Sequence, residues 1–480
     1  MASTPFGASV HPADLTELVA GRSARGRWIL AATVLGSGMA LLDSTVVNIA
    51  LRTIGKEMSA SIGQLQWIVN AYLLALASLI LVSGSLGDRY GRRRLFMIGV
   101  GWFATASALC ALAPSPGLLI GARLLQGIGA ALLTPESLAL IQAGFRAEDR
   151  GRVIGRWAGL GAIAAAVGPL LGGWIVGNVS WRWIFWINVP VALAVLLITV
   201  RHVPESRDPE RVPGFDTTGA ALVVLGLGAV TFALIEAGAV SSGYVAGAAA
   251  LGTAALGLFL WQERRSPHPL LPLRVFGSRV FSVANAMTLL VYGGLGIMTF
   301  FLVLQLQVSS GYSPLAAGLS TLPLTIAMLL LSSRSGALAT KIGPRWQMSV
   351  GPLLCGIGVL LLRGVDRTAP YLTVVLPGVL VFAVGLVALV APLTATVLAA
   401  APDRAAGLAS GINNAVARTG SLLAVAALPA LVGINGQAYL QPAVFTAGYG
   451  EAMAICAGLL IAGGAISFVG LRSTSEQRPG

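Results

Sequence analysis

Charged side chains stand inside stretches of the sequence that are otherwise strongly apolar. Asp43 lies in the apolar run that begins at residue 28, and Arg123 lies a few residues into another such run. An ionised carboxylate near the centre of a bilayer costs about 2.5–3.5 kcal/mol on insertion scales, so it persists only if it is paired, hydrated or able to bind a proton. An arginine keeps its proton, and its expected role is to hold a carboxylate ionised. Asp43 and Arg123 are therefore candidates for binding and releasing a proton together.

Each candidate also has an interpretation that involves no chemistry. Asp43 could be an acid at a helix end in the membrane interface, and Arg123 could extend its side chain to the outer surface. Glu136 follows Pro135 toward the inner end of a predicted helix, where it is either a second proton-binding group or an interfacial residue. The sequence leaves these alternatives open.

Several polar residues inside apolar stretches are candidates for lining a cavity. A polar run late in the chain contains Asn413, Asn414 and Arg418, and earlier stretches contain Asn48 and Gln126. Such side chains either line a cavity or bond one helix to the next. The sequence does not separate these two roles for the late run.

The sequence contains none of the common motifs that hold nucleotides or metals. A phosphate-binding loop needs Ser or Thr after its Lys, but the two lysines are followed by Glu57 and Ile342. The three histidines lie far apart in polar segments, and the sequence has neither an H-E-x-x-H motif nor a Cys/His cluster. We therefore expect no ATP site, no metal and no cofactor.

The elements that must position these residues are membrane-spanning helices. Of the 480 residues, 56% are hydrophobic and only 10% are charged, whereas soluble domains carry about 25% charged residues. A helix crosses the hydrocarbon core with about 20 apolar residues. The sequence predicts an all-α membrane protein with 14 spans, near residues 28–51, 66–86, 95–113, 117–141, 153–176, 183–200, 217–237, 244–261, 280–305, 313–335, 346–363, 371–400, 405–433 and 449–470.

The distribution of arginine predicts how these spans are oriented. An even number of spans places both ends of the chain on one side, and positive charge marks the cytoplasmic side. With a cytoplasmic N-terminus the outer loops receive only five basic residues: Arg52, Lys56, Arg182, Arg363 and Arg367. We therefore expect both termini in the cytoplasm. The net charge of +13 then reflects topology, and no nucleic-acid partner is expected.

Two longer polar loops divide the chain. They cover residues 201–216 and 262–279 and bracket the two middle spans, which leaves six spans on each side. The predicted parts are an N-terminal segment (1–27), a six-helix bundle (28–200), a linker with two extra helices (201–279), a second six-helix bundle (280–470) and a tail (471–480). A faint repeat, GSLGDRYGR from residue 84 and GALATKIGPR from residue 336, supports two related halves, which favours a site between them and alternating access.

Four motifs together resemble the major facilitator superfamily, and within it the fourteen-span drug:proton antiporters. The first, LDSTVVNIAL at residues 42–51, is similar to the helix-1 motif of the family, although Arg52 stands where the family usually has Pro. The second, GSLGDRYGRRR at residues 84–94, is similar to a cytoplasmic loop motif. The resemblance implies that this loop is a conformational latch formed by five residues: Gly84, Asp88, Arg89, Gly91 and Arg92.

The other two motifs concern proton transfer and the direction of transport. RLLQGIGAA at residues 123–131 resembles the family motif whose buried arginine, here Arg123, is implicated in proton transfer. GPLLGG at residues 168–173 resembles the antiporter motif that is associated with exporters, which implies this role for Gly168, Pro169, Gly172 and Gly173. Close packing of small residues explains the chemistry of this last motif equally well.

The expected function is proton-coupled efflux of small amphipathic compounds by alternating access. The expected partners are the substrate, protons and the lipid bilayer of a bacterial cell membrane, and we expect a monomer to suffice. A proton-independent facilitator or a lipid translocator of the same fold is the alternative within transport. A membrane-embedded enzyme or sensor is the alternative of another class, and enzyme chemistry would need convergent nucleophiles, bases or metal ligands that the spans do not contain.

Overall fold

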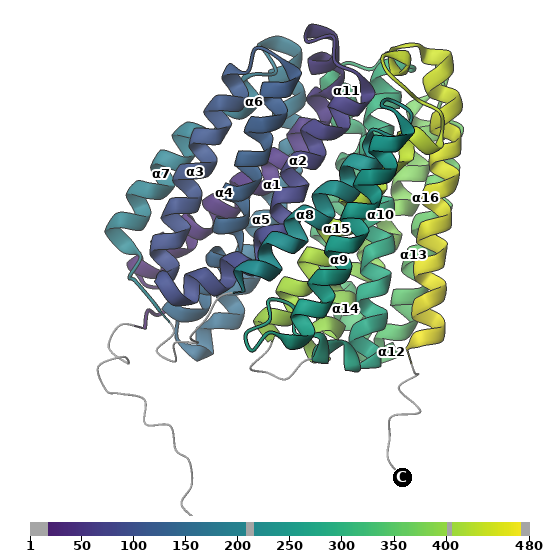
Figure 1. Cartoon of the computed structure of the whole chain (residues 1–480). Coiled ribbons are helices and arrows are strands. Elements are labelled where there is room, and N and C mark those ends of the chain that lie inside the picture. Colours follow the sequence, from purple (N-terminus) through teal and green to yellow (C-terminus); the bar gives the residue numbers. More distant parts are fainter. Residues whose placement is uncertain (1–17, 208–215, 401–405, 472–480) are drawn as a thin grey trace, which may run out of the picture.

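The computed structural model describes residues 18–207, 216–400 and 406–471, and within them the chain is built from helices (Figure 1). Fourteen helical stretches are long and apolar enough to cross a membrane, as the sequence predicted. Residues 1–17 and 472–480, which make up most of the predicted N-terminal segment and tail, lie outside the described residues.

The first half of the chain supplies the first six spans. They are formed by α1 (Ala24–Glu57), α2 (Ile62–Tyr90), α3 (Arg92–Leu112), α4 (Pro116–Gly144), α5 (Ala147–Asn178), α6 (Trp183–Trp186) and α7 (Asn188–His202). The short α6 and the longer α7 together form the sixth span, which is interrupted at Ile187. The helices continue past the predicted apolar limits, because polar residues at a membrane surface can remain helical: α1 ends at Glu57 instead of near residue 51.

The middle of the chain forms a hairpin of α8 (Thr217–Ile235) and α9 (Ser242–Arg265), followed by the short helix η1 (Leu273–Gly277). The second half consists of α10 (Arg279–Val308), α11 (Pro314–Ser320), α12 (Leu322–Ile342), α13 (Pro344–Leu362), η2 (Tyr371–Val375), α14 (Leu376–Ala399), α15 (Ala406–Leu431), η4 (Ala438–Leu440) and α16 (Pro442–Gly470). α11 and α12 together form one span. α16 begins about two turns before the predicted residue 449.

The faint sequence repeat corresponds to a repeated backbone feature. Gly91 ends α2 and starts α3 with φ +110°, and Gly343 stands at the matching point between α12 and α13 with φ +82°. L-residues with a side chain rarely adopt such φ values, so glycine is required at both turns. The second and third spans of the two halves are therefore joined by the same kind of tight turn.

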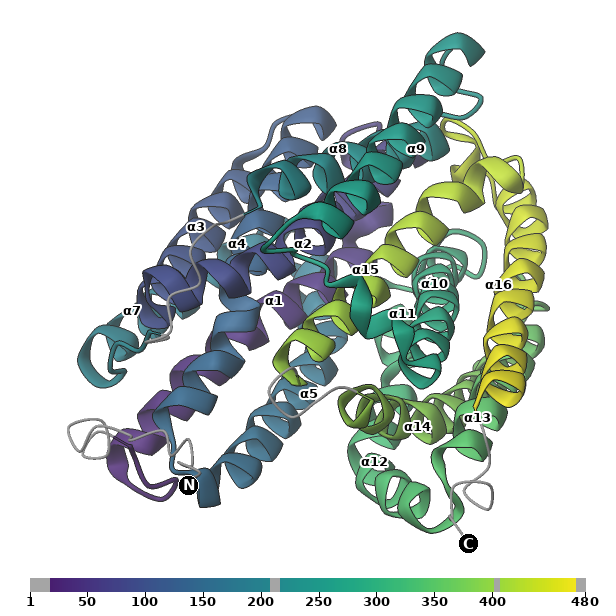
Figure 2. The ribbon, with the colours of Figure 1, turned by 60° about the horizontal axis from the view of Figure 1, so that its bottom comes forward.

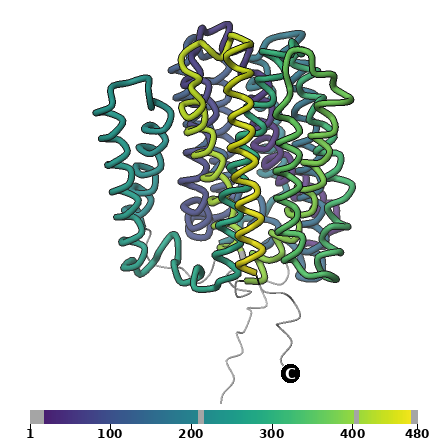
Figure 3. The backbone as a smooth tube through the Cα atoms, turned by 90° about the vertical axis from the view of Figure 1, so that its right-hand side faces the viewer, coloured from purple at the N-terminus to yellow at the C-terminus, as the bar shows by residue number. Residues whose placement is uncertain are grey.

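The helices form two six-helix bundles with the α8–α9 hairpin at the side (Figures 2 and 3). α8 contacts both α2 of the first bundle and α15 of the second, so the hairpin lies across the seam between the bundles. We call the end at which α1 begins and α16 ends the proximal end, and the opposite end the distal end. The orientation of these ends relative to the cytoplasm stays a prediction, as do the residue boundaries of the predicted parts.

Hydrogen bonds join the two bundles at the distal end. Gln66 of α2 donates from Nε2 to the carbonyl oxygens of Val425 (2.6 Å) and Ala426 (2.8 Å), and Gln307 of α10 donates to the carbonyl oxygen of Ile49 (3.0 Å). The loop before α16 adds further bonds to the turn between α1 and α2. Among the described residues, no hydrogen bond or ion pair joins the bundles at the proximal end. The structure is thus the distally closed state.

Candidate functional site: a buried carboxylate network

Asp43 lies near the middle of α1 and is only 1% exposed. Its Oδ2 accepts a hydrogen bond from Nη1 of Arg123 (2.5 Å), and its Oδ1 accepts one from Nε2 of Gln126 (2.8 Å). Both donors stand on α4, one turn apart, so they face Asp43 from the same side of that helix. The interfacial interpretation of Asp43 does not fit this position, because the carboxylate is enclosed by protein and fully paired.

The guanidinium of Arg123 is held by partners in addition to Asp43. Its Nε donates to the carbonyl oxygen of Ile68 (3.1 Å), and its Nη1 also donates to Oε1 of Gln126 (2.6 Å). Its Cζ lies 4.4 Å from the ring centroid of Tyr72, which is within the range of a cation–π contact. Arg123 is 1% exposed, so its side chain does not extend to the outer surface.

Ser107 of α3 and Asn188 of α7 extend the cluster. The Oγ of Ser107 accepts hydrogen bonds from Gln126 (3.2 Å) and from Asn188 (3.0 Å), and Ser107 donates to the carbonyl oxygen of Phe185 (2.9 Å). Asn188 also reaches Oδ1 of Asp43 at 3.5 Å. We call this set the carboxylate network: Asp43, Ser107, Arg123, Gln126 and Asn188.

The sequence analysis missed two members of the network. Ser107 stands among apolar residues of α3, where Thr105 is the other hydroxyl, and Asn188 stands directly after the interruption between α6 and α7. A buried polar group needs a hydrogen-bond partner, so an isolated polar residue in an apolar span is a signal for such a network. That signal exists in the sequence, but it does not say which helix supplies the partner.

Glu136 is buried elsewhere. It lies about 20 Å further along α4 than Arg123, at a rise of about 1.5 Å per residue, toward the proximal end. It is 1% exposed, and neither carboxylate oxygen has a hydrogen-bond partner among the described residues. The carboxylate packs directly against Gly87 of α2, where any side chain would collide with it. The structure therefore brings together Asp43 and Arg123 but not Glu136.

The predicted latch forms the turn between α2 and α3. Arg92 donates to Oδ1 of Asp88 at 2.8 Å, and both side chains are partly exposed. The Arg89 guanidinium lies 5.4 Å from the ring centroid of Tyr90. Gly84 has open space around it. Within the described residues, none of these side chains bonds to the second bundle, which agrees with a proximal end that is not joined.

Glu205 is a further component at this turn that the sequence analysis missed. Its carboxylate accepts hydrogen bonds from the backbone N–H groups of Arg93 (3.1 Å) and Arg94 (3.2 Å), which lie in the first turn of α3. A carboxylate at a helix N-terminus satisfies free N–H groups and interacts favourably with the helix dipole. The segment after α7 is thus attached to the latch turn.

The glycine motif of α5 lies where three helices meet. A side chain at Gly168 would collide with Thr45 of α1, and a Cβ at Gly172 would lie 2.5 Å from Cγ1 of Val46. A Cβ at Gly173 would lie 2.6 Å from Cα of Leu315 in α11. The carbonyl of Pro169 packs just as closely on Gly318 of α11. This motif therefore brings α1, α5 and the second bundle together at the seam.

The remaining polar candidates differ in position. Asn413 donates to Thr288 (2.8 Å) and to Asn285 (3.2 Å) of α10, so it bonds two helices together. Asn414, one residue later, is exposed and donates to the carbonyl oxygen of Ser410 (3.2 Å). Asn48 donates to its own helix.

Arg418 is half-buried near the middle of α15 and has no hydrogen bond to any described residue. α15 packs against α2 of the first bundle and α10 of the second, so Arg418 stands in a helix that lies at the seam.

Nothing in the described part of the chain forms a metal centre. Residues 18–207, 216–400 and 406–471 contain no group of three or more His, Cys, Asp or Glu side chains that could hold a metal ion. The carboxylate network contains a single acid beside two amides, a hydroxyl and an arginine.

Comparisons with known proteins identify the family and agree with the fold. The family model described as the Major Facilitator Superfamily matches residues 33–425. The "Multidrug resistance protein Stp" of Mycobacterium tuberculosis (strain CDC 1551 / Oshkosh) is 37% identical over 420 residues, covering 86% of this chain and 77% of that protein. The "Puromycin resistance protein pur8" of Streptomyces alboniger is 34% identical over 476 residues, covering 95% of this chain and 93% of that protein. Among solved structures, a bacterial homologue of the human lysosomal transporter Spinster, inward-facing and occupied, is 16% identical with a TM-score of 0.69, covering 96% of this chain and 100% of that chain.

Proposed function

Because this chain belongs to the Major Facilitator Superfamily of membrane transporters, we propose that it exports small amphipathic compounds by alternating access, in exchange for protons that bind at Asp43. The observation that carries the proposal is the pairing of Asp43 with Arg123 inside the first bundle, where both side chains are 1% exposed. A carboxylate in such a place is a candidate functional site by default, and proton binding is one of the functions it can serve.

Protonation of Asp43 changes the network in a defined way. The ionised carboxylate accepts bonds from Arg123 and Gln126, and a proton on it cancels the ion pair. Removing one partner of a buried pair costs about 3–5 kcal/mol. Arg123 keeps the Ile68 carbonyl, the Gln126 oxygen and the Tyr72 ring, so its charge stays partly compensated. Protonation of Asp43 thus changes the energy difference between the inward-open and outward-open states, which arrange these helices differently.

The proton gradient supplies enough energy for this exchange. One proton that moves inward through 100 mV releases about 2.3 kcal/mol, and each unit of pH difference adds about 1.4 kcal/mol. Tenfold accumulation of an uncharged compound costs the same 1.4 kcal/mol. A monovalent cation exchanged for one proton would use only the pH difference. Binding of substrate near Asp43 competes with protonation, which is the coupling.

The distribution of charge supports a direction. Arginines concentrate at the proximal end, where the latch turn lies, and positive charge favours the cytoplasmic side. With that orientation, the distally closed structure is an inward-open state that receives substrate from the cytoplasm or the inner leaflet. Closing the proximal end would then bring the latch residues Asp88, Arg89 and Arg92 against the second bundle.

The names of the relatives support the substrate class. Stp is described as a multidrug resistance protein and pur8 as a puromycin resistance protein. We propose that this chain also exports amphipathic antibiotics from a bacterial cell, across the cell membrane and as a monomer. A proton-independent facilitator or a lipid translocator of the same fold is the competing function, and no contact among the described residues favours it.

Uptake into inverted membrane vesicles tests the proposal. Vesicles that contain the full chain are energised by acidifying their lumen, so that protons flow outward, and are given radiolabelled puromycin in the medium. Wild-type protein is expected to accumulate puromycin, and both a protonophore and Asp43→Asn are expected to abolish the gradient-dependent part. Glu148→Gln is the matched control, because Glu148 is a carboxylate of the same bundle whose side chain is 76% exposed. Uptake that persists with the protonophore and in Asp43→Asn would reject coupling through Asp43.

A further inference from the structure

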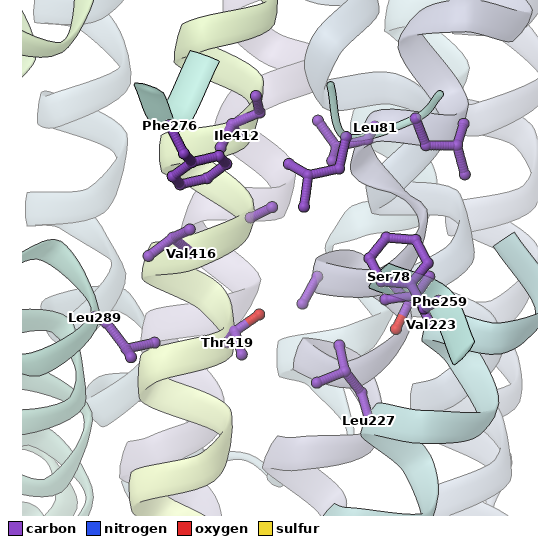
Figure 4. A pocket seen from close by; sticks show the side chains of 14 residues that line it. Ser78, Leu81, Val223, Leu227, Phe259, Phe276, Leu289, Ile412, Val416 and Thr419 are labelled. Carbon is purple, nitrogen blue, oxygen red and sulfur yellow. The ribbon is translucent and has the colours of Figure 1, made fainter. Parts of the chain in front are cut away.

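A cavity lies at the seam between the bundles, away from the carboxylate network. It is lined by α2, α8, α9, α10 and α15 together with the segment around η1, and its volume is about 190 Å³. The first bundle, the inserted hairpin and the second bundle all contribute to its walls. We call it the seam pocket (Figure 4).

The hairpin closes this pocket from the side. α8 lies on both α2 and α15, and its residues Val223 and Leu227 face the pocket together with Phe259 of α9. Phe276 covers the pocket from the segment before α10. The α8–α9 hairpin therefore supplies part of the pocket wall, and the shape of the pocket depends on how the two bundles are positioned relative to each other.

The chemistry of the walls is apolar with two exceptions. Ser78 of α2 and Thr419 of α15 present hydroxyl groups from facing helices (Figure 4). Ser78 is 4% exposed, and its Oγ has no hydrogen-bond partner among the described residues. A buried hydroxyl without a partner is unfavourable, and a ligand that supplies the missing hydrogen bond gains affinity.

We propose that the seam pocket binds the apolar ring or short alkyl part of an exported compound, whose one hydrogen-bonding group meets the Ser78 hydroxyl. The inference rests on the proposed export function for the source of the ligand. A dry apolar cavity of about 150 Å³ is large enough to bind benzene, so about 190 Å³ suits a single substituted ring. An acyl chain has no polar atom along its length and would leave Ser78 unpaired.

Because the seam pocket lies between the two bundles, a ligand bound there can affect the conformational change of transport. The walls on α2 and α15 belong to different bundles, so rocking of the bundles changes the pocket. A ligand that binds one state better than the other shifts the equilibrium toward that state. An amphipathic compound held here from the bilayer side would stand beside the seam through which it must pass.

Photolabelling of the full chain in lipid vesicles tests the proposal. The probes are a phenyl diazirine that carries one hydroxyl and the same diazirine without it, and the labelled positions are mapped by mass spectrometry. We expect the phenol probe to label the pocket segment of α15, residues 412–419, and Ala415→Phe to reduce this labelling at least tenfold. Ala254→Phe, the same change at an exposed position of α9, is the control and should leave it unchanged.

A smaller substitution protects the test against misfolding. Ser78→Ala is expected to weaken labelling by the phenol probe about fivefold, the effect of one net hydrogen bond, and to leave labelling by the probe without a hydroxyl unchanged. If neither Ala415→Phe nor Ser78→Ala changes the labelling of residues 412–419 by the two probes, the proposal is overturned.

Lipid as the occupant is tested with a photoreactive acyl chain in the same vesicles. Acyl-chain labelling of residues 412–419 that excess phenol probe does not displace would also overturn the proposal. Puromycin uptake is measured on the same preparations. If uptake is proton-independent but the phenol probe still labels the pocket as expected, the export mechanism fails and the binding site stands. If uptake is proton-driven and the pocket is not labelled, only the binding site fails.

Discussion

Gln66→Ala should loosen the distal closure of the protein. Gln66 donates two hydrogen bonds from α2 to α15, to the carbonyl oxygens of Val425 at 2.6 Å and Ala426 at 2.8 Å. These bonds join the bundles only while the distal end is closed. At about 0.5–1.5 kcal/mol for each bond, the closed state loses about 1–3 kcal/mol relative to a distally open state. We expect the ratio of distally open to distally closed molecules to rise about 5–150-fold.

Spin labels can measure this shift. One pair of labels at Asn178 and Asp366, which are exposed in different bundles near the distal end, reports distal opening. A second pair at Glu148 and Lys341 reports the proximal end, where the distance should decrease as the distal distance increases. Pulsed electron–electron double resonance on spin-labelled protein in lipid nanodiscs gives both distance distributions.

The matched control is Gln64→Ala. Gln64 stands two residues earlier on α2 and takes part in the capping box with Ser61, without a bond to the second bundle. Distance distributions that are unchanged in Gln66→Ala would refute the role of this bond in distal closure. An equal shift in both variants would refute it as well, because the cause would then be a general weakening of α2.

Three further predictions concern packing, the arginine and the latch turn. Gly172→Val should abolish export and lower the yield of folded protein, because its Cβ would lie 2.5 Å from Cγ1 of Val46. Gly177→Val is the control and should do neither, because a Cβ at Gly177 meets open space; export assays and size-exclusion profiles compare the two variants. Arg123→Lys should lower the rate of puromycin export at least tenfold, because a lysine cannot bond to Asp43, Gln126 and the Ile68 carbonyl in the same planar arrangement; export equal to wild type would contradict this. Glu205→Ala should lower the free energy of unfolding by about 0.5–2 kcal/mol, as the loss of a helix cap does, and Glu451→Ala, which removes an exposed carboxylate inside α16, should not; thermal unfolding of the two variants in one detergent checks this.

The sequence was sufficient to predict the fourteen spans, and it indicated the pairing of Asp43 with Arg123 beside the alternative that each lies at the membrane interface. Span length follows from bilayer thickness, and a charge inside lipid must find a partner, so both predictions rest on strong physical constraints. Helix ends were less accurate, as in α1 and α16, because residues at a membrane surface remain helical after the apolar run has ended.

Details that depend on tertiary contacts could not be predicted in this way. The partners Ser107 and Asn188 come from other helices, and the stacking of Arg123 on Tyr72 depends on how α2 and α4 pack. The attachment of Glu205 to α3 requires knowledge of how the loop after α7 folds back. Asn413 could line a cavity or bond two helices, and only the positions of Asn285 and Thr288 show that it bonds them. The seam pocket has mostly apolar walls, which carry no distinctive sequence pattern.

Proton release on substrate binding tests the central claim most directly. Purified protein in weakly buffered detergent solution is mixed with saturating puromycin at a series of pH values, and a pH-indicator dye counts the protons released at each. Wild-type protein should release about one proton per bound puromycin, and Asp43→Asn should bind puromycin and release none. Equal release from both proteins would place the coupling proton elsewhere, and binding to wild-type protein without release at any pH would contradict exchange of substrate for a proton.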